Sequence, residues 1–253
     1  MNILLTNDDG IRAPGLKALA DAFSAAGHGA YICAPNRERS AVSHGGTFDR
    51  ALRAEPVDYP GAKAAWACDG TPSDCASLGV FLVRRQAKLD LAVSGINRGM
   101  NAGGACVYSG TVGAAMEAAM AGVQALAVSL YFDPHGTARE DYAPAARAAL
   151  RVAEWVPAHP LPRGVLYNLN VPALPYEQLK GIAPATLAPV FLNDPVFTQA
   201  DDGGWLYGNV DFPPMDGPKW DVGLCERGWC SLTKLTWDFR LNAPDDELNG
   251  IKL

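Results

Sequence analysis

The stretch Ile3-Leu4-Leu5-Thr6-Asn7-Asp8-Asp9-Gly10 joins a short apolar run to an acidic turn, and it decides how the rest of the chain is interpreted. Residues 3–6 have the length and composition of a buried strand. Apolar residues at helical spacing follow over residues 14–26, with Pro14 suited to the first turn and Gly27 to the end. A second apolar run covers residues 30–34. This order predicts a parallel βαβ unit with a right-handed crossover.

The same alternation continues to about residue 174. We expect further strands at residues 53–57, 64–68, 89–94, 125–130 and 164–170, and helices at 72–85, 111–121 and 142–156. After Leu174, Pro, Gly, Asp and aromatic residues increase, and short extended pieces such as 205–207 and 229–235 replace the helical pattern. The sequence therefore predicts a three-layer, doubly wound α/β core over residues 1–174 and a smaller β-rich appendage over residues 175–253. Ligands of such a core bind beyond the carboxyl ends of its strands.

Composition excludes several classes of protein. The chain has 253 residues, 49% of them apolar, and a chain of this length buries roughly three quarters of its unfolded surface. Its 21 Lys and Arg against 27 Asp and Glu leave a net charge of −6, which argues against a nucleic-acid duplex or an anionic membrane as a partner. No apolar run approaches the ~20 residues of a membrane span, and the residues after Met1 do not resemble a signal peptide.

The six cysteines are scattered through the chain without a CxxC motif. In a chain of this size, that spacing is typical of reduced, buried thiols, so we expect a cytoplasmic protein. The alternative for Cys225 and Cys230 is a bridge across a hairpin.

Asp8 and Asp9 are the sharpest chemical feature. Adjacent carboxylates at the end of a strand repel each other, and their burial without a partner costs on the order of several kcal/mol. A hard divalent cation resolves this conflict, because it takes oxygen ligands from carboxylate, amide and hydroxyl groups. Ser40 and Asn97 follow neighbouring strands and offer such oxygens. The alternative is that one aspartate caps the helix near Pro14 or forms a turn with Gly10.

A glycine-rich segment, expected as a loop over residues 95–110, leads from Asn97 to the next helix. Glycines there let backbone amides approach a ligand, and Ser109 and Thr111 add hydroxyl groups at a helix N-terminus, which suits a phosphate. An ordinary helix cap after a loop is the alternative. The chain has neither a Walker lysine motif nor GxGxxG at the first crossover, and HExxH and GxSxG are also absent.

The loop after the second strand carries further polar groups with two interpretations each. His44 is either a base or phosphate donor, or a solvated loop histidine. Arg37 and Arg39 either contact a phosphate or pair with nearby acids such as Glu38.

Several motifs, taken in order, closely resemble the SurE family of stationary-phase survival proteins, which are metal-dependent 5′-nucleotidases. They are residues 3–10 with Ala13-Pro14-Gly15, Arg39-Ser40 with Ser43, Gly70-Thr71-Pro72-Ser73-Asp74-Cys75, Val93-Ser94-Gly95-Ile96-Asn97-Arg98-Gly99 with Asn101, and Tyr108-Ser109-Gly110-Thr111-Val112 with Glu117. The family often has Gly where this chain has Ala41 and Asp where it has Asn36.

The resemblance implies a Rossmann-like core that hydrolyses nucleoside 5′-monophosphates with one Mg²⁺ or Mn²⁺ ion per subunit. By position, Asp8 and Asp9 would be catalytic. The metal ligands would be Asp8, Asp9, Ser40 and Asn97, and the phosphate-binding residues would be Asn101, Ser109, Gly110 and Thr111. It also implies a homodimer or homotetramer in which a C-terminal segment such as residues 235–253 is exchanged between subunits.

The mechanism that we expect is direct attack by a metal-bound water on phosphorus, with Asp8 or Asp9 accepting the proton. An aspartyl-phosphate mechanism with Asp8 as nucleophile is a second hypothesis, although no lysine lies in the strand-end loops. A non-catalytic, metal-dependent nucleotide sensor is the third.

Overall fold

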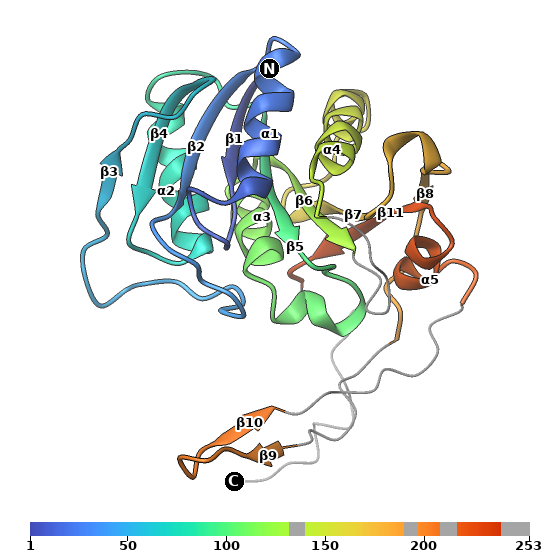
Figure 1. Ribbon diagram of the computed structural model, residues 1–253. Coiled ribbons are helices and arrows are strands. Elements are labelled where there is room, and N and C mark those ends of the chain that lie inside the picture. The colour runs from blue at the N-terminus through green and yellow to red at the C-terminus, as the bar shows by residue number, and fades with distance from the viewer. Residues whose placement is uncertain (132–139, 190–196, 208–216, 239–253) are drawn as a thin grey trace, which may run out of the picture.

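A central sheet of nine strands dominates the computed structural model, which describes all residues except 132–139, 190–196, 208–216 and 239–253 (Figure 1). The strand order is β3-β4-β2-β1-β5-β6-β7-β11-β8. Its strands are β1 (Asn2–Thr6), β2 (Gly29–Pro35), β3 (Ala54–Pro56), β4 (Ala62–Cys68), β5 (Leu91–Arg98), β6 (Gln124–Tyr131), β7 (Val165–Pro172), β8 (Ile182–Pro184) and β11 (Cys230–Thr236). A separate antiparallel pair is formed by β9 (Phe197–Gln199) and β10 (Trp205–Tyr207).

The five neighbouring pairs from β4 to β7 are all parallel. Strand order reverses beside β1, because β2 pairs on one side of it and β5 on the other. This confirms the predicted doubly wound α/β fold with a small antiparallel sheet in its C-terminal part. The carboxyl ends of β1 and β5 form the switch point at which such sheets bind ligands.

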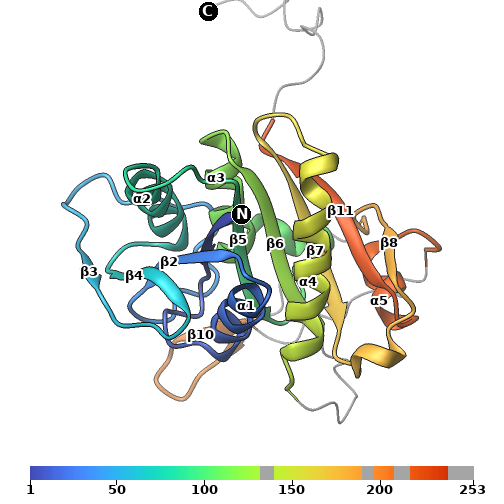
Figure 2. The ribbon, with the colours of Figure 1, turned by 90° about the horizontal axis from the view of Figure 1, so that it is seen from above.

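Helices cover both faces of the sheet. They are α1 (Pro14–Ala25), α2 (Pro72–Arg84), α3 (Gly110–Met120), α4 (Ala143–Trp155) and α5 (Asp221–Glu226), with short 3₁₀ turns η1 (Gly103–Val107), η2 (Val156–Ala158) and η3 (Tyr176–Gln178). Seen from above, α1 and α4 lie on one face, and α2 and α3 lie on the other (Figure 2). The two largest buried clusters of the core accordingly lie one on each face. None of the described helices is both long and apolar enough to cross a membrane.

The N-terminus of α2 follows from its local sequence. The Thr71 hydroxyl accepts the Asp74 N–H, and the Asp74 carboxylate accepts the Thr71 N–H, which completes a capping box with Pro72 in the first turn. Asp74 also accepts the N–H and the hydroxyl of Thr47. The cap of α2 therefore anchors the loop after β2.

The structure departs from the predicted elements in two places. The expected loop over residues 95–110 is partly ordered, because β5 continues to Arg98 past a register shift and η1 follows. The C-terminal part contains a helix, α5, which the fading periodicity after residue 174 did not predict, because this helix has only six residues.

Residues after 174 also extend the central sheet. β11 pairs antiparallel with β7, and β8 pairs parallel with β11. These strands cover the backbone groups that β7 would otherwise expose at an edge. The domain boundary at residue 174 stays a prediction. Two strands that follow this residue, β8 and β11, complete the sheet of the core.

Candidate functional site

The candidate site lies where β1 ends. Asn7 is fully buried, and its side chain both accepts the Gly10 N–H and donates to the Gly10 carbonyl. This closed turn holds Asp8 and Asp9 at the carboxyl end of the strand. The turn is also joined to the end of β2, because the Ile11 N–H donates to the Pro35 carbonyl and the Arg39 N–H to the Asp8 carbonyl.

Asp8 contacts the N-terminus of α3. The Thr111 hydroxyl donates to Asp8 Oδ1 at 2.5 Å, and both side chains are buried. Gly110 permits this approach, since a Cβ atom there would lie 2.9 Å from the Asp8 Cβ. Burial raises the pKa of Asp8, and the bond from Thr111 opposes this effect. The acidic turn and the helix N-terminus, 103 residues apart in sequence, therefore form one site.

Asp9 is half-buried beside Asp8. Burial and then the charge of Asp8 raise its pKa to about 6, whereas the backbone and charge of Arg98 lower it. Two neighbouring carboxylates whose charged forms are both disfavoured fit a bound divalent cation, which would restore the ionised state of each.

Of the other predicted metal ligands, Ser40 lies on the loop after β2 and Asn97 lies near the end of β5. Ser40 is exposed, and its hydroxyl donates to Glu38 Oε1 at 2.7 Å. The Asn97 amide nitrogen donates to the Gly99 carbonyl at 2.8 Å, so its Oδ1 is the atom suited to a cation. Within the described residues, no three His, Cys, Asp or Glu side chains form a metal-holding group. A site here would combine the two aspartates with hydroxyl and amide oxygens.

Two of the predicted phosphate-binding residues, Ser109 and Asn101, make different kinds of contact. Ser109 caps α3, with its hydroxyl accepting the Val112 N–H at 3.0 Å. Asn101 instead supports the interior, because its side chain donates to Ser129 Oγ and its carbonyl accepts from Asn168 and Asn170. Ser109 therefore lies at the helix N-terminus that contacts Asp8, whereas the Asn101 side chain is bonded within the interior.

The loop after β2 packs on α3. His44 Nε2 lies 2.8 Å from Glu117 Oε2, so the pairing of His44 with an acid adds a third interpretation to the two given above. Gly113 allows this contact, since a Cβ atom there would lie 2.7 Å from the Ser43 carbonyl oxygen. Arg39 donates to the Asp69 carbonyl at 2.9 Å. All six cysteines are free, including Cys225 and Cys230.

Asp221 is a supporting residue that sequence reasoning missed. It is fully buried in the first turn of α5, and its carboxylate accepts the N–H groups of Gly103, Ala188 and Val222. It thus joins the glycine-rich loop to the C-terminal part of the chain. Nothing in the sequence around Asp221 indicates a partner 118 residues away.

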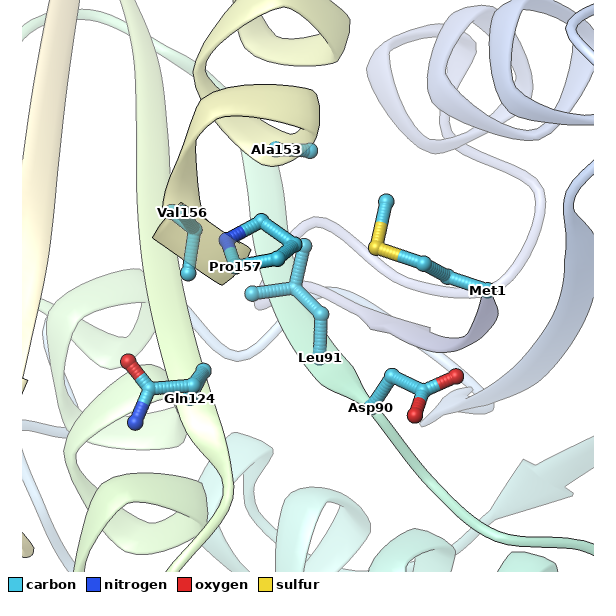
Figure 3. A pocket seen from close by; sticks show the side chains of 7 residues that line it. All are labelled: Met1, Asp90, Leu91, Gln124, Ala153, Val156 and Pro157. Carbon is cyan, nitrogen blue, oxygen red and sulfur yellow. The ribbon is translucent and has the colours of Figure 1, made fainter. Parts of the chain in front are cut away.

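Two open pockets lie away from this site. The pocket in Figure 3 is lined by residues at the amino ends of β1, β5 and β6 and at the end of α4, including Met1, Asp90 and Gln124. The second lies beside α4, β8 and β11, and Arg151, Trp155 and Ile182 are among its lining residues. Neither contains a predicted site residue, and the amino ends are opposite to the edge at which parallel sheets bind ligands.

Fold and site together define an α/β protein with two adjacent carboxylates at the switch point of a parallel sheet, one of them in contact with the N-terminus of a helix. The sequence model described as "Survival protein SurE" matches residues 3–192. The chain belongs to the SurE family.

Relatives match this chain over nearly its whole length. A protein of Synechococcus sp. (strain JA-3-3Ab), named 5′-nucleotidase SurE, is 40% identical over 98% of this chain and 96% of its own. A protein of Geotalea daltonii with the same name is 42% identical over 94% of each. The crystal structure of the SurE protein from Aquifex aeolicus superimposes with a TM-score of 0.79 at 29% identity, covering 95% of each chain. The resemblance inferred from the motifs is confirmed.

Proposed function

We propose that this chain is a metal-dependent 5′-nucleotidase that hydrolyses nucleoside 5′-monophosphates to nucleoside and phosphate. The observation that carries the proposal is the contact between Thr111 and Asp8, because it brings an anion-binding helix N-terminus beside a metal-binding pair of carboxylates. A phosphate ester held by α3 would lie next to the group that activates water.

The curated relatives support this activity, since proteins 40% and 42% identical to this chain are named 5′-nucleotidases. They favour an enzyme over the non-catalytic sensor. The aspartyl-phosphate hypothesis is less favoured, because that chemistry normally uses a lysine near the phosphate and none lies in the strand-end loops.

Asp8, Asp9, Ser40 and Asn97 would hold one Mg²⁺ or Mn²⁺ ion. When bound, such an ion polarises a phosphoryl oxygen and lowers the pKa of a coordinated water. The chain's own groups would do the rest. The first amides of α3 and the Ser109 hydroxyl would bind the phosphoryl oxygens and stabilise their charge during transfer. We assign proton acceptance to Asp9, since it is the more accessible of the two aspartates.

The test is phosphate release from AMP and GMP with Mg²⁺, with Mn²⁺ and with EDTA. We expect metal-dependent release that EDTA abolishes. Asp8→Asn should lower kcat by about 10³-fold or more with an unchanged fold, because one neutral amide oxygen replaces a charged ligand. Asp21→Asn, on the exposed face of α1, is the matched control. Release by Asp8→Asn at the parent rate in excess Mg²⁺ would contradict the ligand assignment.

We also propose a homodimer or homotetramer in the cytoplasm. The family resemblance supports the assembly, and the free thiols of all six cysteines fit a reducing compartment. The exchanged segment, residues 235–253, falls largely outside the described residues, which end at 238.

A further inference from the structure

The loop that carries Ser40 is fixed against the acidic turn by its backbone. The Arg39 N–H donates to the Asp8 carbonyl at 2.8 Å, and the Ile11 N–H donates to the Pro35 carbonyl at 2.8 Å. A Cβ atom on Gly10 would lie only 3.2 Å from the Arg37 carbonyl carbon, so the two turns are in direct contact. Residues 37–39 are therefore held in contact with the acidic turn.

Within this loop, Glu38 bonds the proposed ligand Ser40. The Ser40 hydroxyl donates to Glu38 Oε1 at 2.7 Å. The charge of Glu38 also reaches the acidic pair, because it raises the pKa of both Asp8 and Asp9. Glu38 is thus close to the proposed metal site without belonging to any metal-holding cluster of the described residues.

A serine hydroxyl that coordinates a hard cation uses an oxygen lone pair, and its proton then needs an acceptor elsewhere. Groups that accept a hydrogen bond from a metal ligand orient that ligand and increase metal affinity. The carboxylate of Glu38 is such an acceptor, since it already receives the proton of Ser40.

We propose that Glu38 is a positioning residue that orients the Ser40 hydroxyl toward a divalent cation held by Asp8 and Asp9. This inference rests on the proposed function, and it assigns to Glu38 a role that acts through Ser40. A simple contribution of negative charge would act on the cation whether or not Ser40 is present, so the two roles can be separated.

The experiment measures Mn²⁺ binding directly, by the electron paramagnetic resonance signal of the free ion, with no substrate present. The variants are Glu38→Ala, Ser40→Ala, the double variant and Asp8→Asn. Glu55→Ala, on the exposed edge strand β3, is the control for the loss of one negative charge. Glu38 is exposed, so its variant should keep the melting temperature of the parent in EDTA.

We expect Glu38→Ala to raise the Mn²⁺ dissociation constant by about 10-fold, the usual effect of removing such a supporting group. In the Ser40→Ala background, the same change should have less than about a 2-fold effect, because the hydroxyl that Glu38 orients is gone. An unchanged affinity of Glu38→Ala would overturn the proposal. So would a full effect of Glu38→Ala in the Ser40→Ala background, since that result assigns the effect to charge alone.

Asp8→Asn separates this inference from the proposed function. If Asp8→Asn loses Mn²⁺ binding and Glu38→Ala does not weaken it, only the role of Glu38 is wrong. If Asp8→Asn binds Mn²⁺ as the parent does, the metal site itself is wrong.

Discussion

Asp8 and Asp221 show how buried carboxylates acquire different roles from their neighbours. Asp8 accepts the Thr111 hydroxyl and lies beside a second acid; burial raises its pKa, and a cation would stabilise its charged form. Asp221 accepts the N–H groups of Gly103, Ala188 and Val222, so its oxygens are occupied by the backbone. The residue type is the same, and only the surrounding donors distinguish a candidate metal ligand from a structural support.

Ala41 is a position at which a substitution should increase the stability of the fold. Its φ of 57° lies in the left-handed region, which costs a residue with a Cβ atom about 1–2 kcal/mol. Ala41→Gly removes that cost and makes the unfolded chain freer by about 0.4–1 kcal/mol, so we expect a net gain of roughly 0.5 kcal/mol. Thermal unfolding should show a melting temperature about 1–2 °C higher.

Ala22→Gly, in the ordinary helical backbone of α1, is the control, and it should destabilise the protein by about 1 kcal/mol. If Ala41→Gly lowers the melting temperature as much as Ala22→Gly does, the conformation assigned to residue 41 is wrong.

Glu117 predicts a pH dependence of stability. The bond with His44 lowers the pKa of Glu117 below its ordinary value in the folded protein. A carboxylate with a depressed pKa stabilises the fold fully above its unfolded pKa, and this contribution is lost as the pH falls through the folded pKa. Glu117→Gln should therefore lower the melting temperature by about 1–3 °C near pH 7 and by less near pH 3, because a hydrogen bond to a partly exposed charged group contributes on the order of 1 kcal/mol.

Glu55→Gln, on an exposed strand, should show no difference at either pH. A deficit of Glu117→Gln that is equal at both pH values would mean that the charge of Glu117 does not contribute to the contact between the loop and α3.

Pairs of elements far apart in sequence create the site. The turn after β1 lies against the N-terminus of α3, the loop after β2 packs on α3 and on the cap of α2, and α5 supports the glycine-rich loop. Each contact involves at least one side chain, and three of the four pair a carboxylate with a backbone N–H or a hydroxyl group, whereas the fourth pairs His44 with Glu117. We therefore expect the geometry of the site to depend also on contacts between elements whose residues bind neither the metal nor the phosphate.

Asp221→Asn tests the contact between α5 and the glycine-rich loop. An amide has one acceptor oxygen, so one buried N–H loses its partner at a cost of about 1–3 kcal/mol. We expect a melting temperature lower by about 3–8 °C and a higher KM for AMP, because the loop that contains Asn101 loses its support.

The control is Asp202→Asn, whose carboxylate accepts the Gly204 N–H on an exposed turn. Equal behaviour of Asp221→Asn and Asp202→Asn would show that the loop does not depend on α5.

The C-terminal residues divide into a part that completes the central sheet and a part that is predicted to join subunits. β11 lies between β7 and β8 in the central sheet, with Leu169 opposite Leu232. Residues 239–253 follow that sheet and include most of the segment that is predicted to be exchanged between subunits.

Two deletions should therefore have opposite results. Removal of residues 229–253 exposes the edge of β7 and should prevent soluble folding. Removal of residues 239–253 should leave the melting temperature of the fold intact and reduce the molecular mass measured by light scattering to that of a smaller assembly. A shortened chain of 238 residues with the same assembly as the parent would contradict the exchanged segment.

The sequence by itself determined the parallel core and the identity of the acidic turn. Strands such as β1 and helices such as α1 are local, because the length of an apolar run and its period are written in consecutive residues. The order of Asp8-Asp9, Ser40, Asn97 and Ser109-Gly110-Thr111 also sufficed for the family resemblance. Local patterns carried these inferences, since each motif is a short run of consecutive residues close to the end of a strand or the start of a helix.

Only the tertiary structure decided which groups meet. It turned the side chain of Asn101 inward to Ser129, paired His44 with Glu117, placed Asp221 under Gly103 and put β11 beside β7. These contacts join residues between 28 and 118 positions apart. Burial and hydrogen bonding across such distances depend on how the layers pack, and no local pattern of polarity records the partner.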